Sequence, residues 1–110
     1  MKKIPMSVAA AGLLRALLAR AKIDRNRILL TEFRSTEWQS LTFMGARHRF
    51  RFRIPGSTAG EVVRTLTNEL QDAEFSIPGQ IVADIAIVGE PESGGDGSVS
   101  VDIEALTIAE

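Results

Sequence analysis

Four arginines alternate with apolar and aromatic residues along one short segment of this chain. The segment contains Arg47, Arg49, Arg51 and Arg53, separated by His48, Phe50 and Phe52 and followed by Ile54. Because successive side chains of a β-strand point to opposite faces, this pattern predicts a strand with the four guanidinium groups, here called the arginine row, on one face. At a repeat of about 6.8 Å, the row could follow a phosphate backbone or pair with acids on neighbouring strands.

The distribution of charge along the chain favours ion pairs within the domain over nucleic-acid binding as the role of the arginine row. Residues 1–55 contain 12 basic and 3 acidic side chains, whereas residues 56–110 contain 1 basic and 11 acidic ones. One folded domain allows these two halves to neutralise each other. A surface for nucleic-acid bases would also place aromatic rings among the cations, but Phe50 and Phe52 alternate to the opposite face. We therefore expect Arg49 and Arg51 to face acids of neighbouring strands, namely Asp84, Asp102 and Glu104.

Two single residues could also carry chemistry. Asp84 interrupts the apolar run 81–88, and a carboxylate in such a run either finds a cation or has a raised pKa. We expect a buried, structurally paired charge there. His48 is the only histidine, and its place on the Phe50 face predicts a packing role, because a general base would need an orienting carboxylate.

The segment before the second expected helix could hold an anion or contact a partner. It brings Arg53 close in sequence to the hydroxyls of Ser57 and Thr58 and to free backbone N–H groups. The Gly-Lys-Ser/Thr ending of a phosphate-binding loop is missing. Thr58 followed by Glu61 matches a capping box, so ordinary helix capping is the favoured interpretation.

Composition narrows the classes of function. With no cysteine, the chain has no disulfide framework, thiol nucleophile or thiolate metal site, and a cytoplasmic location is the default expectation. No nucleophile elbow or dinucleotide fingerprint is present, and Asp96 in its glycine-rich loop does not match a calcium loop. We expect no enzymatic activity, no cofactor and no metal.

Periodicity and turn signals predict seven elements. They are a Ser7-capped helix over 5–22, strands over 28–34, 38–44 and 47–54, a helix over 58–72, and strands over 81–88 and 99–108 with a bulge in the last. Gly45-Ala46 indicates a two-residue turn, which would make 38–54 a hairpin; the alternative is one long bent strand. Residues 90–97 are expected to form a flexible acidic loop.

This order predicts one α+β domain over residues 1–110. We expect a two-layer sandwich in which two helices pack on a mainly antiparallel sheet of four to five strands, in the order α-β-β-(β)-α-β-β. The basic start Met1-Lys2-Lys3 and the apolar residues after it look superficially like a signal peptide. Arg15 and Arg20 interrupt that stretch, so neither secretion nor a membrane span is expected.

Three motifs resemble those of a small group of bacterial proteins with no known activity. They are Trp38-x-Ser40-x-Thr42-Phe43-x-Gly45-x-Arg47-His48, the run Ile77-Pro78-Gly79-x-Ile81-Val82-Ala83-Asp84-Ile85, and Glu104-Ala105-Leu106-Thr107. The order of elements is also distantly similar to phage-type tail-completion proteins, a resemblance that implies ring assembly without catalysis.

The favoured function is a small, non-enzymatic interaction module that associates with itself, most simply as a dimer. Val82, Ala86 and Val88 are expected to leave an apolar surface on the side of the sheet opposite the helices. A contact with another protein is a further alternative for the arginine row, Ser57 and Thr58. The alternatives are an anion or nucleic-acid binder that uses the arginine row, and a structural tail-completion protein.

Overall fold

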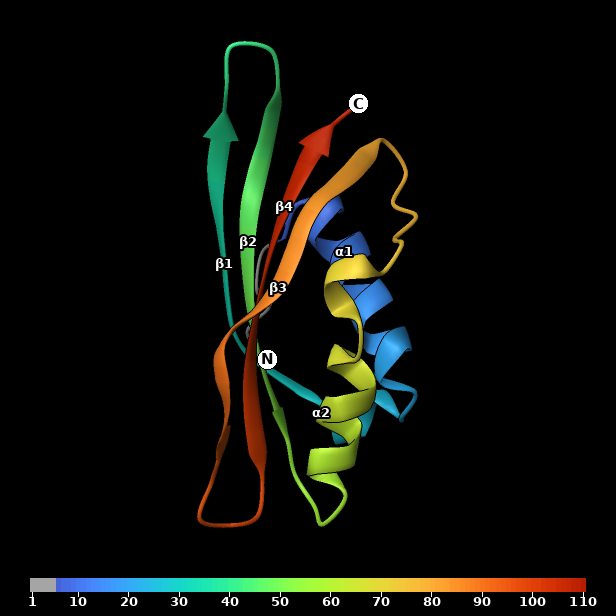
Figure 1. Cartoon of the computed structure of the whole chain (residues 1–110), viewed down its shortest axis with the longest axis vertical. Coiled ribbons are helices and arrows are strands. Elements are labelled where there is room, and N and C mark those ends of the chain that lie inside the picture. Colours follow the sequence, from blue (N-terminus) through green and yellow to red (C-terminus); the bar gives the residue numbers. More distant parts are fainter. Residues whose placement is uncertain (1–5) are drawn as a thin grey trace.

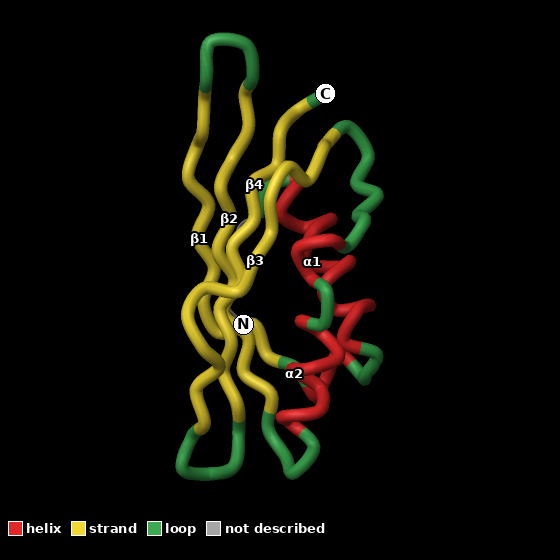
Figure 2. The backbone as a smooth tube through the Cα atoms, in the orientation of Figure 1, coloured by secondary structure: helices red, strands yellow, loops and turns green. Residues whose placement is uncertain are grey.

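Two helices lie against one side of a four-stranded antiparallel sheet (Figures 1 and 2). The computed structural model describes residues 6–110, so the basic start of the chain lies outside the described residues. The elements are α1 (Val8–Ala21), β1 (Leu29–Gln39), β2 (Met44–Ile54), α2 (Ala59–Thr67), β3 (Gln80–Ser93) and β4 (Val99–Ala109). The strands are ordered β1-β2-β4-β3 across the sheet. The expected α+β class is confirmed, with four strands.

A side-chain cap begins helix α1 and a left-handed residue ends it. The Ser7 hydroxyl accepts a hydrogen bond from the backbone N–H of Ala10 at 3.1 Å, as the sequence predicts. The helix ends at Lys22, which adopts a left-handed conformation. Arg20 then joins the two helices, because its guanidinium donates to the carbonyl oxygens of Leu66, at 2.9 Å, and of Asn68 at the end of α2.

The segment 38–54 contains a hairpin whose turn is not where the sequence places it. Trp38 lies at the end of β1, next to its last residue Gln39, and does not open a separate strand; the turn runs through residues 40–43. The Ser40 hydroxyl and backbone hold this turn by bonding the Phe43 N–H and carbonyl at 3.0 and 2.9 Å. The predicted Gly45-Ala46 turn is wrong. The hairpin extends beyond the ends of the other two strands (Figure 1).

Gly45 has a different role, inside β2. A Cβ atom at this position would lie 2.0 Å from the carbonyl oxygen of Thr107 on β4. Strands β2 and β4 therefore approach each other so closely here that only glycine fits.

Strand β3 is longer and more irregular than expected. It continues through the first part of the predicted acidic loop, and its pairing with β4 is shifted at Val82/Asp84 and again at Val88/Glu92. The predicted bulge in β4 is wrong, because β4 alternates between buried and half-buried residues from Val101 to Ile108. The additional residues lie in β3, the edge strand.

The core lies between the helices and the inner face of the sheet. Phe50, Phe52 and Ile54 of β2 are buried, as the alternation predicts, and the two phenylalanine rings stack with centroids 6.1 Å apart. They pack in one cluster with buried residues of the helices and of β4, including Leu13, Leu17, Val62, Leu66, Val101 and Ile103. The sheet thus presents one face to the core, and no helix among residues 6–110 covers the other face.

Candidate functional site

The uncovered side of the sheet, here called the helix-free face, contains the arginine row. Since Phe50 and Phe52 point into the core, the arginines between them on β2 point the other way. On the neighbouring central strand, β4, Asp102 and Glu104 are the register partners of Arg51 and Arg49. Directly paired residues of antiparallel strands share a face. Basic side chains of β2 and acidic side chains of β4 therefore lie next to each other.

Asp102 is the centre of this charge arrangement. Both of its carboxylate oxygens accept hydrogen bonds from Arg51 at 3.1 Å, and Oδ2 also accepts one from Arg49 at 3.2 Å. Arg51 makes a second ion pair, with Glu92 on β3 at 3.2 Å. The Asp102 carboxylate, followed by Glu92, raises the pKa of the Arg51 guanidinium. The prediction that Arg49 and Arg51 face Asp102 is confirmed.

The two outer arginines of the row are paired as well. Arg47 donates to Glu104 at 3.1 Å, and Arg53 bonds Asp96 and the Ser98 hydroxyl in the turn between β3 and β4. Hydrogen bonds from Ser98, with the nearby Arg53 charge, lower the pKa of Asp96 to about 2. Every ion pair found among residues 6–110 joins the basic first half to the acidic second half.

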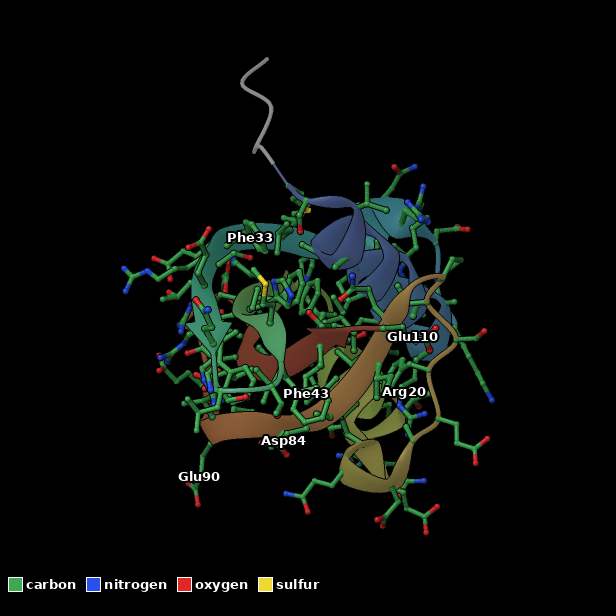
Figure 3. All side chains as sticks on the ribbon, turned by 90° about the horizontal axis from the view of Figure 1, so that it is seen from above. Arg20, Phe33, Phe43, Asp84, Glu90 and Glu110 are labelled. Atoms are coloured by element: carbon green, nitrogen blue, oxygen red, sulfur yellow. The ribbon has the colours of Figure 1, made fainter. Side chains whose placement is uncertain are left out.

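Asp84 does not behave as predicted. It is exposed on β3, points away from the body of the molecule (Figure 3), and has no cation within ion-pair distance among the described residues. The predictions of a buried charge and of pairing with the arginine row are therefore wrong. The physical reason is that β3 is an edge strand with a bulge at this point, so water solvates the carboxylate.

The same bulge changes which apolar side chains point outward. Val82 is the register partner of buried Thr107 and packs partly against the core, so its predicted outward orientation is wrong. Ala86 and Val88 are partners of Glu104 and Asp102 and lie on the helix-free face, as predicted.

A row of uncharged residues crosses one end of the helix-free face. Strand pairing aligns Trp38 of β1 with Gly45 of β2, Gly45 with Ile108 of β4, and Ile108 with Ile81 of β3. Leu106 adjoins this row, and Ile81 is 51% exposed. We call Trp38, Ile81, Leu106 and Ile108 the apolar end. Only strand register places these four residues together, so their spacing along the chain gives no signal of it.

Exposed charges for which no ion pair is found among residues 6–110 lie on both edge strands. Arg34 of β1 is exposed beside Arg49, and no carboxylate among residues 6–110 lies within ion-pair distance of it. Asp84 occupies β3 at the opposite edge. Arg34 also borders a shallow groove of about 490 Å³ on this face, whose lining includes Glu32, Arg49, Arg51 and Asp102.

The start of α2 is not assembled as an anion site around Arg53. Arg53 is directed to the turn between β3 and β4, and the Thr58 hydroxyl instead accepts a hydrogen bond from Arg27 at 3.0 Å. Thr58 occupies the N-cap position without a side-chain capping bond, so the predicted capping box is wrong. Ser57 is exposed beside it.

His48 is buried between two hydroxyl groups. Its Nδ1 lies 2.6 Å from the Ser35 hydroxyl and its Nε2 lies 2.8 Å from that of Thr107. Burial lowers the pKa of the imidazole, which favours the neutral ring. A neutral ring donates through one nitrogen and accepts through the other, so the two hydroxyls satisfy it completely. The predicted packing role agrees with this burial.

Comparisons of the chain with protein-family models, with curated proteins and with solved structures find no match. Across residues 6–110, no helix combines the length and the apolar character that crossing a membrane requires. In the same part of the chain, no three histidine or carboxylate side chains gather closely enough to hold a metal ion.

Proposed function

We propose that this chain is a small, non-catalytic module that associates with a second copy of itself through the helix-free face. The observation that carries the proposal is the apolar end, whose side chains come from β1, β3 and β4 and which no helix among residues 6–110 covers. Removing apolar surface from water contributes about 25 cal/mol per Å². A second copy that covered the apolar end would gain this contribution.

The ion pairs of the arginine row favour self-association over nucleic-acid binding. All four guanidinium groups already bond acidic side chains of the same domain. A phosphate backbone would have to displace these acids and would also meet their negative charge. A second copy meets a face on which basic and acidic side chains are interleaved, so it is not repelled by one dominant sign of charge. We place this module in the cytoplasm, because a chain without cysteine forms no disulfides and therefore does not require an oxidising compartment.

Sedimentation velocity over the micromolar range tests the proposal with two variants. Ile81→Asp puts a charge into the apolar end and should shift the chain to a monomer of 12.0 kDa. Val8→Asp is the matched control, because Val8 is 81% exposed on α1 and lies outside the helix-free face. We expect the control to associate like the wild type. Equal association of all three proteins would contradict the proposal.

A nucleic-acid binder is the second candidate, because Arg34, Arg49 and Arg51 border one groove. It predicts binding of single-stranded or duplex nucleic acid that weakens steeply with salt, with a slope that falls by about one for each arginine removed. Self-association predicts weak binding of this kind. The tail-completion resemblance predicts a closed ring in place of a dimer, and the mass of such a ring would be several times that of one chain.

A further inference from the structure

We infer that the second copy packs face to face with a two-fold axis parallel to the strands, which brings Arg34 of each copy to Asp84 of the other. This inference rests on the proposed function and specifies how the partner is oriented. It follows from three features of the helix-free face: where its apolar end lies, which strands carry its charges, and which charges have no partner.

The apolar end selects the direction of the axis. In a face-to-face dimer the two-fold axis lies in the plane between the sheets, and its two limiting directions run along the strands and across them. An axis across the strands places the apolar end of one copy over the charged end of the other. An axis along the strands exchanges the two edges of the sheet but keeps its ends, so Ile81 and Ile108 meet the same apolar end of the partner.

The charged strands select the same direction. An axis across the strands places β2 over β2 of the second copy, and arginine row would face arginine row. An axis along the strands places β2 over β4, because the sheet order is β1-β2-β4-β3. Arginines of one copy then face Asp102 and Glu104 of the other, which is the electrostatically complementary arrangement.

Two of the charges that have no ion pair among residues 6–110 complete the argument. Arg34 belongs to β1 and Asp84 to β3, the two strands that the axis along the strands superimposes. Arg34 pairs in register with Arg49, and Asp84 with Leu106, which is the partner of Arg47. Arg34 and the partner's Asp84 are therefore offset by two residues along the strand direction, which is about 7 Å. The long arginine side chain can span such an offset.

The size and the edges of the sheet agree with face-to-face packing. Four strands about 4.8 Å apart and about ten paired residues long make a face of roughly 650 Å², close to the roughly 800 Å² that each partner buries in a standard interface. Both edge strands have pairing irregularities, at Leu30/Glu32 in β1 and at two places in β3. Such bulges hinder the addition of a strand at an edge.

Charge exchange tests the predicted contact. Arg34→Glu and Asp84→Arg should each weaken dimerisation about tenfold, since every dimer loses two ion pairs and gains two repulsions. The double variant restores opposite charges and should recover wild-type dimerisation. Arg15→Glu, at an exposed position of α1, is the control and should have no effect on dimerisation. Failure of the double variant to recover, while both single variants dimerise weakly, would overturn the contact.

Cross-linking tests the axis independently, because the chain has no cysteine of its own. Glu32 of β1 and Val88 of β3 belong to one residue row, through Arg51 and Asp102. A mixture of Glu32→Cys and Val88→Cys, treated with a short bis-maleimide suited to sheets about 10 Å apart, should give a cross-linked dimer. Each variant treated alone should not.

The possible failures separate the two proposals. Cross-linking of each variant with itself, with no product in the mixture that joins the Glu32→Cys chain to the Val88→Cys chain, would favour an axis across the strands and overturn the inference. A dimer that forms without any cross-link would also overturn it while leaving self-association intact. A chain that remains monomeric would overturn the proposed function itself.

Discussion

Arg51 and Asp102 are joined across the two central strands by a three-centre contact, in which both carboxylate oxygens lie 3.1 Å from Nη1 of the guanidinium group. Asp102 is held further by Arg49, and Arg51 by Glu92 on the edge strand. One acid thus holds two of the four arginines in the row. This relationship explains how a chain with opposite charges in its two halves folds into one nearly neutral domain.

Removing the Asp102 carboxylate should release both of its arginines. We expect Asp102→Ala to lower the free energy of unfolding by about 1 kcal/mol, a small value because Arg49 and Arg51 remain partly exposed. Nucleic acid should then bind more tightly than it binds the wild type. Urea unfolding and fluorescence anisotropy measure the two effects, with Glu90→Ala at an exposed position as control. Unchanged stability together with unchanged binding would show that the pair has no role.

The core should depend strongly on Phe52. Truncating this fully buried ring in Phe52→Ala should cost about 3–5 kcal/mol, which is enough to unfold a domain of marginal stability. Phe43 is 53% exposed in the hairpin turn, so Phe43→Ala should change stability by less than about 0.5 kcal/mol. Thermal unfolding of the two variants measures the contrast. Similar losses in both would contradict the assigned orientation of β2.

Gly45 should not tolerate any side chain. A Cβ atom there would meet backbone rather than a movable side chain, so Gly45→Ala must separate β2 from β4 and should cost about 2 kcal/mol or more. At Gly95 a Cβ atom would have no neighbouring atom within 4 Å, so Gly95→Ala serves as the control. Chemical denaturation distinguishes the two variants. A tolerated alanine at Gly45 would contradict the close approach of the two strands.

Stability should fall in mildly acidic solution because of His48. Burial lowers the pKa of this imidazole in the folded state, so the unfolded chain binds the proton more readily. The stabilisation is complete above the ordinary histidine pKa, about 6.5, and is lost as the pH falls through that value toward the folded-state pKa. Denaturation between pH 7.5 and about 5 should show this slope in the wild type and a weaker one in His48→Gln. Equal slopes would contradict the prediction.

The local pattern of the sequence predicts β2 well and predicts its surroundings poorly. The alternation of Phe50 and Phe52 with arginines identifies the strand and its two faces without any knowledge of the neighbouring strands. The pattern misses the hairpin turn because residues 40–43 contain neither glycine nor proline. Gly45 is a residue type typical of turns, but here it lies inside a strand and allows β2 to approach β4 closely.

The sequence predicts the candidate site only in part, because pairing between strands decides it. The opposite charges of Asp102 and Arg51 suggest a pair, but the acidic segment around Glu92 has the composition of a loop, so its contact with Arg51 is missed. The bulge in β3 turns Val82 inward and leaves Asp84 in solvent. No periodicity within β3 reveals a bulge that depends on its alignment with β4.

The mass of the wild-type chain in solution tests the central claim most directly. Sedimentation equilibrium across the micromolar range, at low and at physiological salt, should show an average mass that rises with concentration from 12.0 kDa toward twice that value. Because paired charges contribute to the interface, we expect the rise to need higher concentrations at the higher salt. A mass that stays at 12.0 kDa under every condition would contradict self-association through the helix-free face.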